Sequence, residues 1–176
     1  MSDMQVVFVP DSRLRKNSRD VTEDEFGEEL EEHMKRMADK MYELGGVGLS
    51  GVQVGDLRNI IVFNSDRSQP VSYMVNPEIT HYTEEMSEMR EGCLSLPGLE
   101  VDMKRPRGIR VVYFTPLGEK KTEAFSGINS AIIQHEIDHT NGKTLVNFLS
   151  RLKKDIYLRK IKKVKRKIKD MINNQS

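Results

Sequence analysis

The sequence contains a single cysteine, Cys93, among its 176 residues, so no disulfide bond can form within the chain. No apolar run is long enough to span a bilayer. The first residues show neither a secretory signal pattern nor the Arg- and Ser-rich, acid-poor composition of a transit peptide. These absences argue against disulfide-stabilised and membrane-spanning proteins. They favour the cytoplasm, where a lone thiol stays reduced.

The overall charge of +1, from 28 basic and 27 acidic residues, conceals a strong asymmetry. Residues 151–176 contain eleven Lys or Arg and two Asp, a net of +9, which leaves residues 1–150 with a net of −8. The length predicts one domain with room for a sizeable core, and nothing in the sequence requires more than a monomer. We expect residues 1–150 to form its main body and residues 151–176 a basic tail of the same domain.

The basic tail has the pattern of an amphipathic helix. Ile161, Val164, Ile168 and Met171 recur at helical spacing with Lys and Arg between them, and Ser150 is a candidate N-cap. A basic helix of this kind favours contact with nucleic acid, and an anionic membrane surface is the alternative. Lys160, Lys163 and Lys167 are the candidate contact residues.

Elsewhere the patterns predict an α+β fold. A capping box at residues 22–25 precedes an apolar helical repeat that ends at Gly45 and Gly46. Strands are expected where β-branched and aromatic residues concentrate, and surface loops at residues 64–70 and 84–88. The expected strands are residues 58–63, 71–75, 108–114 and 121–125, with a hairpin turn at 116–118. We expect antiparallel strands around a buried central helix, residues 128–139, with an N-terminal helix and the C-terminal basic helix outside them.

The central helix carries the run HEIDH at residues 135–139. On a helix, His135 and His139 lie one turn apart on one face, where two imidazoles can bind a divalent metal. Glu136 can accept a proton from a water molecule that the metal activates. A buried polar pair in so apolar a helix would be unfavourable without partners, which favours a metal site over two ordinary core histidines.

Two ligands do not hold a catalytic metal, and the usual downstream third ligand is missing. The His-x-x-Gly-x-x-His continuation would require a histidine at Leu145, and no His or Glu follows His139. The upstream candidates are Cys93, His33 and His81. His33 lies in a Glu-rich helical segment and His81 in a polar stretch, both typical of a surface. Cys93 follows Gly92, which allows close backbone approach, although most lone cysteines are simply buried apolar residues.

Three segments together resemble the peptide deformylase family. They are GVGLSGVQ at residues 46–53, EGCLS at 91–95 and QHEIDH at 134–139, and their order and separations also match. The resemblance covers roughly residues 5 to 150, which would then be the catalytic domain. Ser50 and Gly51 stand where the family usually has two alanines, and Thr140 where it usually has leucine.

The resemblance implies a ligand set and a mechanism. Cys93, His135 and His139 would hold one metal ion, usually Fe(II), with Zn, Ni or Co able to substitute. Glu136 would be the general base, while the Gln53 side chain and the Leu94 backbone N–H would stabilise the oxyanion.

The implied substrate is a nascent polypeptide that begins with N-formylmethionine, whose formyl group is released as formate. Gly46, Gly48 and Gly92 would let the backbone run close to an extended peptide. The residues that would line a methionine pocket are Val47, Met89, Ile128, Ala131 and Ile132. The basic tail would then contact the ribosome. The alternatives are a zinc endopeptidase and an inactive ribosome-binding homologue.

Overall fold

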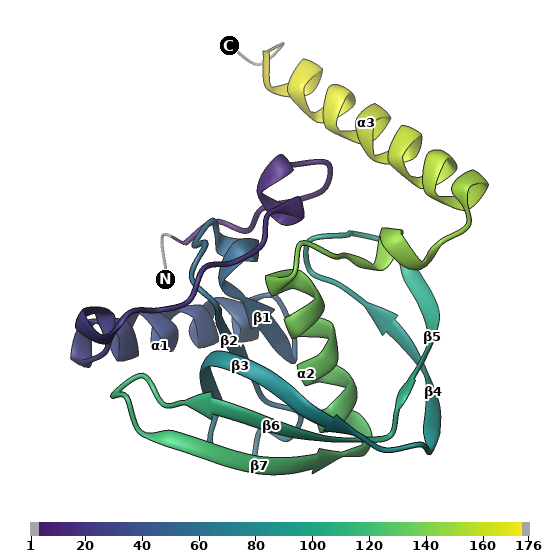
Figure 1. Cartoon of the computed structure of the whole chain (residues 1–176). Coiled ribbons are helices and arrows are strands. Elements are labelled where there is room, and N and C mark those ends of the chain that lie inside the picture. Colours follow the sequence, from purple (N-terminus) through teal and green to yellow (C-terminus); the bar gives the residue numbers. More distant parts are fainter. Residues whose placement is uncertain (1–3, 174–176) are drawn as a thin grey trace.

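The computed structural model describes residues 4–173, without the side chains of residue 165 and residues 167–173. An antiparallel five-stranded sheet and a separate two-stranded sheet enclose a central helix, α2 (Figure 1). The large sheet has the order β1-β2-β3-β6-β7: β1 (Gly48–Ser50), β2 (Ile60–Phe63), β3 (Ser72–Tyr82), β6 (Gly108–Phe114) and β7 (Lys120–Ser126). The small sheet pairs β4 (Met86–Gly92) with β5 (Glu100–Pro106). The predicted α+β architecture is confirmed.

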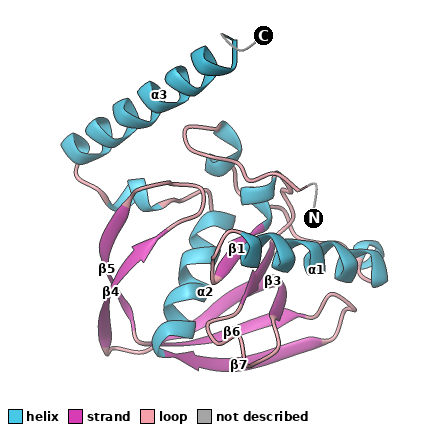
Figure 2. Cartoon of the chain, turned by 180° about the vertical axis from the view of Figure 1, so that it is seen from behind, coloured by secondary structure: helices cyan, strands magenta, loops and turns pink. Residues whose placement is uncertain are grey.

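Strand β2 is buried on both faces and separates two cores. Successive strand side chains point to opposite faces of a sheet. Ile60 and Val62 pack in the cluster under α1 (Glu28–Glu43), whereas Ile61 and Phe63 pack in the cluster that contains Ile132 and Ile133 of α2 (Gly127–Thr140). The two helices therefore cover opposite faces of the large sheet, as the view from behind shows (Figure 2).

Helix α1 begins later than its sequence pattern predicted. The capping box at residues 22–25 closes a short 3₁₀ turn, Glu23–Glu25, and α1 starts only after Gly27, whose φ of 140° breaks the helix. The predicted end is confirmed: Gly45 has φ 71°, and its N–H donates to Tyr42 O at 3.0 Å. The predicted apolar stripe is confirmed at Leu30, Met34, Met37 and Met41, which are buried, whereas Leu44, predicted at its end, is 42% exposed.

Helix α2 agrees closely with its predicted range. It contacts β1, β2, β5, β6 and β7, so it is enclosed on most sides. Ile128 in its first turn is the exception, with 54% of its surface exposed. The helix ends at Thr140, and Gly142 follows two residues later, where φ is 69° and an added Cβ would lie 2.7 Å from Arg15 O. This close approach requires glycine at the position.

The small sheet was not predicted. Residues 84–88 were expected in a loop, but β4 begins at Met86, and β5 and the short β1 were also missed. The predicted strands at 58–63, 71–75, 108–114 and 121–125 correspond to β2, β3, β6 and β7, but β3 continues to Tyr82, seven residues beyond its predicted end. The loop at 64–70 and the turn near Gly118 are confirmed as well.

The basic tail forms helix α3 (Arg151–Asn173), and the Lys153 N–H donates to the predicted cap Ser150 Oγ at 3.4 Å. Tyr157 and Ile161 are buried against the domain, whereas Val164 is 45% exposed. The side chains of Ile168 and Met171, also predicted in the apolar stripe, lie outside the described residues. No helix among residues 4–173 is long and apolar enough to cross a membrane.

Candidate metal centre

His135 and His139 lie one turn apart on α2, as their spacing predicts. Their Nε2 atoms are 3.2 Å apart, and both residues are buried, His139 almost completely. Burial lowers the pKa of His139 well below its ordinary value, so its imidazole is neutral and has a lone pair for a metal. The two rings supply half of a tetrahedral ligand set.

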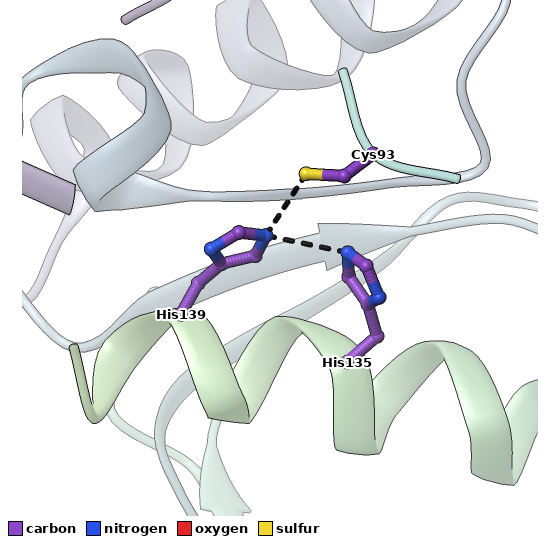
Figure 3. A group of neighbouring side chains, drawn as sticks. All are labelled: Cys93, His135 and His139. Carbon is purple, nitrogen blue, oxygen red and sulfur yellow. Dashed lines mark hydrogen bonds between the residues drawn. The ribbon is translucent and has the colours of Figure 1, made fainter. Parts of the chain in front are cut away.

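Cys93 reaches this pair from the loop between β4 and β5 (Figure 3). Its Sγ lies 3.2 Å from His139 Nε2, and the three donor atoms lie within 4.8 Å of one another. Ordinary bond lengths around one tetrahedral ion give about 3.3 Å between two nitrogens and about 3.6 Å between nitrogen and sulfur. The donors therefore fit one borderline divalent ion, with a fourth position open for a reactant.

The other two histidines are not part of this group. His33 is half-buried on α1, and its Nε2 lies 3.0 Å from Asp56 Oδ2, so the expectation of a solvated surface was wrong for this residue. His81 is exposed on β3. Within residues 4–173, Cys93 is the one upstream candidate that the fold brings to the histidine pair.

The half-buried Glu91 and the buried Arg105 orient the His135 ring. Its Nδ1 lies 2.9 Å from Glu91 Oε2, which turns Nε2 toward the other two donors. Arg105 donates from Nε and Nη2 to Glu91 at 2.6 and 3.0 Å, and from Nη1 to Asp138 at 2.9 Å. Burial raises the pKa of Glu91, but the bonds to His135 and Arg105 outweigh this effect and lower it, so Glu91 is ionised.

Sequence reasoning missed this network. Glu91 belongs to the EGCLS segment and Asp138 lies between the two histidines, so both stood inside recognised motifs without an assigned role. Arg105 lies outside both motifs, on a strand that was not predicted. Nothing in its local sequence distinguishes it from the other basic residues.

The hydrogen bond between Glu91 and His135 also affects proton binding by His135. Burial lowers its pKa, but hydrogen bonds with Cys93 and Glu91 prevail and raise it to about 10. A proton and a metal ion compete for the same Nε2 lone pair, so metal binding here releases a proton.

Glu136 points from α2 toward β1. The residue is 4% exposed, and its Oε2 atom is buried without a hydrogen-bond partner. Burial raises its pKa to about 7. A Cβ added at Gly48 would collide with Glu136 Oε1, so glycine is what lets the carboxylate lie against the strand. An unpartnered carboxylate of near-neutral pKa is suited to exchanging a proton with a reactant.

Gln53 is held in one orientation by Ser50. The Gln53 Oε1 atom accepts from Ser50 N at 2.9 Å and lies 3.0 Å from Ser50 Oγ, which gives that buried hydroxyl a partner. The Gln53 Nε2 atom then faces Cys93 Sγ at 3.5 Å and Ser95 Oγ at 3.2 Å. This amide presents its donor end to the metal site.

A pocket of about 850 Å³ opens onto Cys93, His135 and Glu136. Gln53 and Leu94 line it, as do all eight residues that were expected to bind substrate: Gly46, Val47, Gly48, Met89, Gly92, Ile128, Ala131 and Ile132. Lys160 and Lys163 are exposed on α3, away from this pocket, and the Lys167 side chain lies outside the described residues.

Comparison with known proteins agrees with this geometry. The family model for polypeptide deformylase matches residues 4–155. A peptide deformylase of Rickettsia akari is 36% identical over 176 residues, covering 96% of this chain and 99% of that protein. The structure of peptide deformylase from Ehrlichia chaffeensis in complex with actinonin has a TM-score of 0.88 and 32% identity, covering 94% of this chain and 99% of that one. A peptide deformylase from Legionella pneumophila has a TM-score of 0.83 and 35% identity, covering 92% and 95%.

Proposed function

The chain belongs to the polypeptide deformylase family, and we propose that it binds one Fe(II) ion through Cys93, His135 and His139. Its reaction is the hydrolysis of the formyl group from the N-terminal formylmethionine of nascent polypeptides, with release of formate. The observation that carries the ligand proposal is the convergence of one sulfur and two nitrogen donors beside an unpartnered buried carboxylate.

The donor set supports a borderline divalent ion, so Zn, Ni or Co can substitute for iron. A bound divalent ion would act as a Lewis acid toward the formyl carbonyl and lower the pKa of water. Glu91 and Arg105 fix the His135 ring for this purpose, and burial of His139 keeps its imidazole unprotonated.

We assign Glu136 as general base and then general acid. Its carboxylate accepts a proton from the attacking water as the new carbon–oxygen bond forms. It returns that proton to the departing amine as the carbon–nitrogen bond breaks, which leaves formate and a free N-terminus. Burial supports this role, since it raises the pKa of Glu136 to about 7 and makes both proton transfers feasible near neutral pH.

Gln53 and Leu94 are the proposed oxyanion donors. The Gln53 amide is fixed by Ser50 with its Nε2 toward Cys93, and Leu94 follows Cys93 directly in the chain. Donors already aimed at the site need no reorganisation as negative charge develops on the formyl oxygen.

The methionine side chain would occupy the apolar part of the pocket, against Val47, Met89, Ile128, Ala131 and Ile132. Gly46, Gly48 and Gly92 leave the peptide backbone room to pass. A formyl group is the smallest acyl group, so a narrow space beside the metal would admit it and exclude ordinary peptide carbonyls.

The exposed basic face of α3, including Lys160 and Lys163, is the proposed contact with ribosomal RNA. We place the enzyme in the cytoplasm, where nascent chains are made, as a monomer. Residues 1–150 would be catalytic, with residues 151–176 as the binding helix.

One experiment tests the catalytic assignment against its alternatives. Protein loaded anaerobically with Fe(II) is incubated with formyl-Met-Ala-Ser and, separately, with unformylated peptides. We expect formate from the first alone. Cleavage of internal peptide bonds would indicate an endopeptidase, and no reaction by metal-loaded protein would indicate an inactive homologue.

A further inference from the structure

The fold holds the three proposed ligands in place to different degrees. His135 and His139 are fixed by one turn of a buried helix, but Cys93 begins a loop that spans residues 93–99. Two backbone bonds fold this loop, Leu96 N to Cys93 O at 3.0 Å and Leu99 N to Leu96 O at 3.2 Å. The thiol therefore depends on whatever holds the loop against the domain.

Helix α3 provides part of that support through Tyr157. Its hydroxyl lies 3.3 Å from Pro97 O, within the loop. Burial raises the pKa of Tyr157 to about 12, so the hydroxyl keeps its proton and can donate. Tyr157 is 7% exposed and belongs to the same apolar cluster as Leu96, against which Cys93 also packs.

The N-terminal segment also holds the loop. Val9 N donates to Ser95 O at 3.0 Å, and Val7 and Val9 belong to the same cluster as Tyr157. The loop is thus held by both the N-terminal segment and α3, through two backbone carbonyls, those of Ser95 and Pro97.

We propose that Tyr157 is a positioning residue, which holds the Cys93 loop so that the thiol meets the two histidines. It touches neither the metal nor the substrate and acts through Pro97 and Leu96. Because Leu94 lies on the same loop, a looser loop also displaces the proposed oxyanion donor. Helix α3 then has a role in the metal site that is separate from its basic face. This inference rests on the proposed role of Cys93 as a ligand.

The test compares Tyr157→Phe with Tyr113→Phe. Both tyrosines are 7% exposed, and both changes remove one hydrogen-bonded hydroxyl. The Tyr113 hydroxyl donates to Glu123 Oε1 at 2.9 Å, and Tyr113 packs in a different apolar cluster, with Ile109 and Val111. Tyr113→Phe therefore controls for a general loss of stability.

Two measurements do not require turnover. Co(II) affinity is followed through the thiolate-to-metal absorption band, and Cys93 reactivity through the rate of alkylation of the metal-free protein. We expect Tyr157→Phe to weaken Co(II) binding and to speed alkylation by about three- to tenfold each, the effect of losing one neutral hydrogen bond. Tyr113→Phe should change neither. In the iron-loaded enzyme, Tyr157→Phe should lower kcat more than it raises KM.

If Tyr157→Phe and Tyr113→Phe show the same Co(II) affinity and the same alkylation rate, the proposal is overturned, because Tyr157 would then only add stability. Tyr157→Ala should enlarge the same effects, and if that variant does not fold, the Phe pair still decides. A wrong ligand assignment would give a different result, because Cys93→Ser would then retain wild-type Co(II) affinity. In that case the alkylation rates of Cys93 would still test whether Tyr157 holds the loop.

Discussion

The carboxylate of Glu91 and the Nδ1 atom of His135 lie 2.9 Å apart, and Arg105 donates to both oxygens of that carboxylate. The strand that supplies Glu91 ends directly before Cys93. One short segment therefore supplies a proposed ligand and orients another.

This relationship predicts the effect of Glu91→Gln. Loss of the ionised acceptor frees the His135 ring, and we expect metal affinity to fall about 10- to 100-fold. The measurement is Co(II) competition with a chelator. Glu88→Gln, on the exposed face of the same strand, is the matched control and should bind as the wild type does. Equal affinity in both variants would contradict the orienting role.

Replacing Glu136 should separate chemistry from metal binding. Glu136→Gln keeps the size of the side chain but removes its proton acceptor, so we expect kcat to fall by about 10²- to 10⁴-fold. The iron content, measured by atomic absorption, should not change. Substantial formate release by this variant would refute Glu136 as the base.

Gly48→Ala places a Cβ against Glu136 Oε1 and 3.0 Å from Ile132 Cγ2. We expect the displaced carboxylate to lower kcat/KM by about 10- to 100-fold. Glu136→Asp shortens the acid and leaves room for the methyl group. In the Glu136→Asp background, Gly48→Ala should therefore lower kcat/KM much less. If the losses of kcat/KM are fully additive in the double variant, the two residues do not interact.

Asp56 should make stability depend on pH. Burial raises its pKa, but hydrogen bonds with His33 and Arg58 outweigh burial and lower it well below the usual range. A carboxyl whose pKa is lowered by folding stabilises the protein above its unfolded pKa of about 3.9, and that contribution is lost as the pH falls further.

We expect the wild type to lose about 1 kcal/mol through this group between pH 6 and pH 3, a figure reduced for partial exposure. The check is urea unfolding at both pH values. Asp56→Asn should lower stability at pH 6 and lose less on acidification, whereas Asp39→Asn, at an exposed site on α1, should follow the wild type. Parallel acid losses in all three proteins would rule out the Asp56 contribution.

Ribosome contact is best tested by charge rather than by truncation, because removal of α3 also removes the buried Tyr157 and Ile161. We expect Lys160→Glu with Lys163→Glu to reduce co-sedimentation with ribosomes by about tenfold or more at low salt, while hydrolysis of a formyl tripeptide is kept. Lys104→Glu with Lys120→Glu, exposed on β5 and β7, controls for net charge. Co-sedimentation that is the same for the wild type and the α3 variant, and the same at low and high salt, would exclude the proposal.

The sequence predicted the central helix and the histidine pair because their spacing is local. It did not predict β4 and β5, and the reason is physical. The inward positions of these strands include Glu91 and Arg105, which break the apolar alternation that marks a strand. The polar residues that support the site thus remove the sequence pattern by which β4 and β5 could have been predicted. The docking of Tyr157 on the Cys93 loop is a contact between distant segments, which no local pattern encodes.

The ligand cluster joins a loop at Cys93 to a helix that begins more than thirty residues later, at Gly127. An incomplete or unfolded chain cannot bring these donors together, so under the proposed ligand set tight metal uptake must follow tertiary folding. Metal occupancy would then report that a molecule has completed its tertiary fold. During its own synthesis, the enzyme would gain activity only after α2 had left the ribosome and docked between the two sheets.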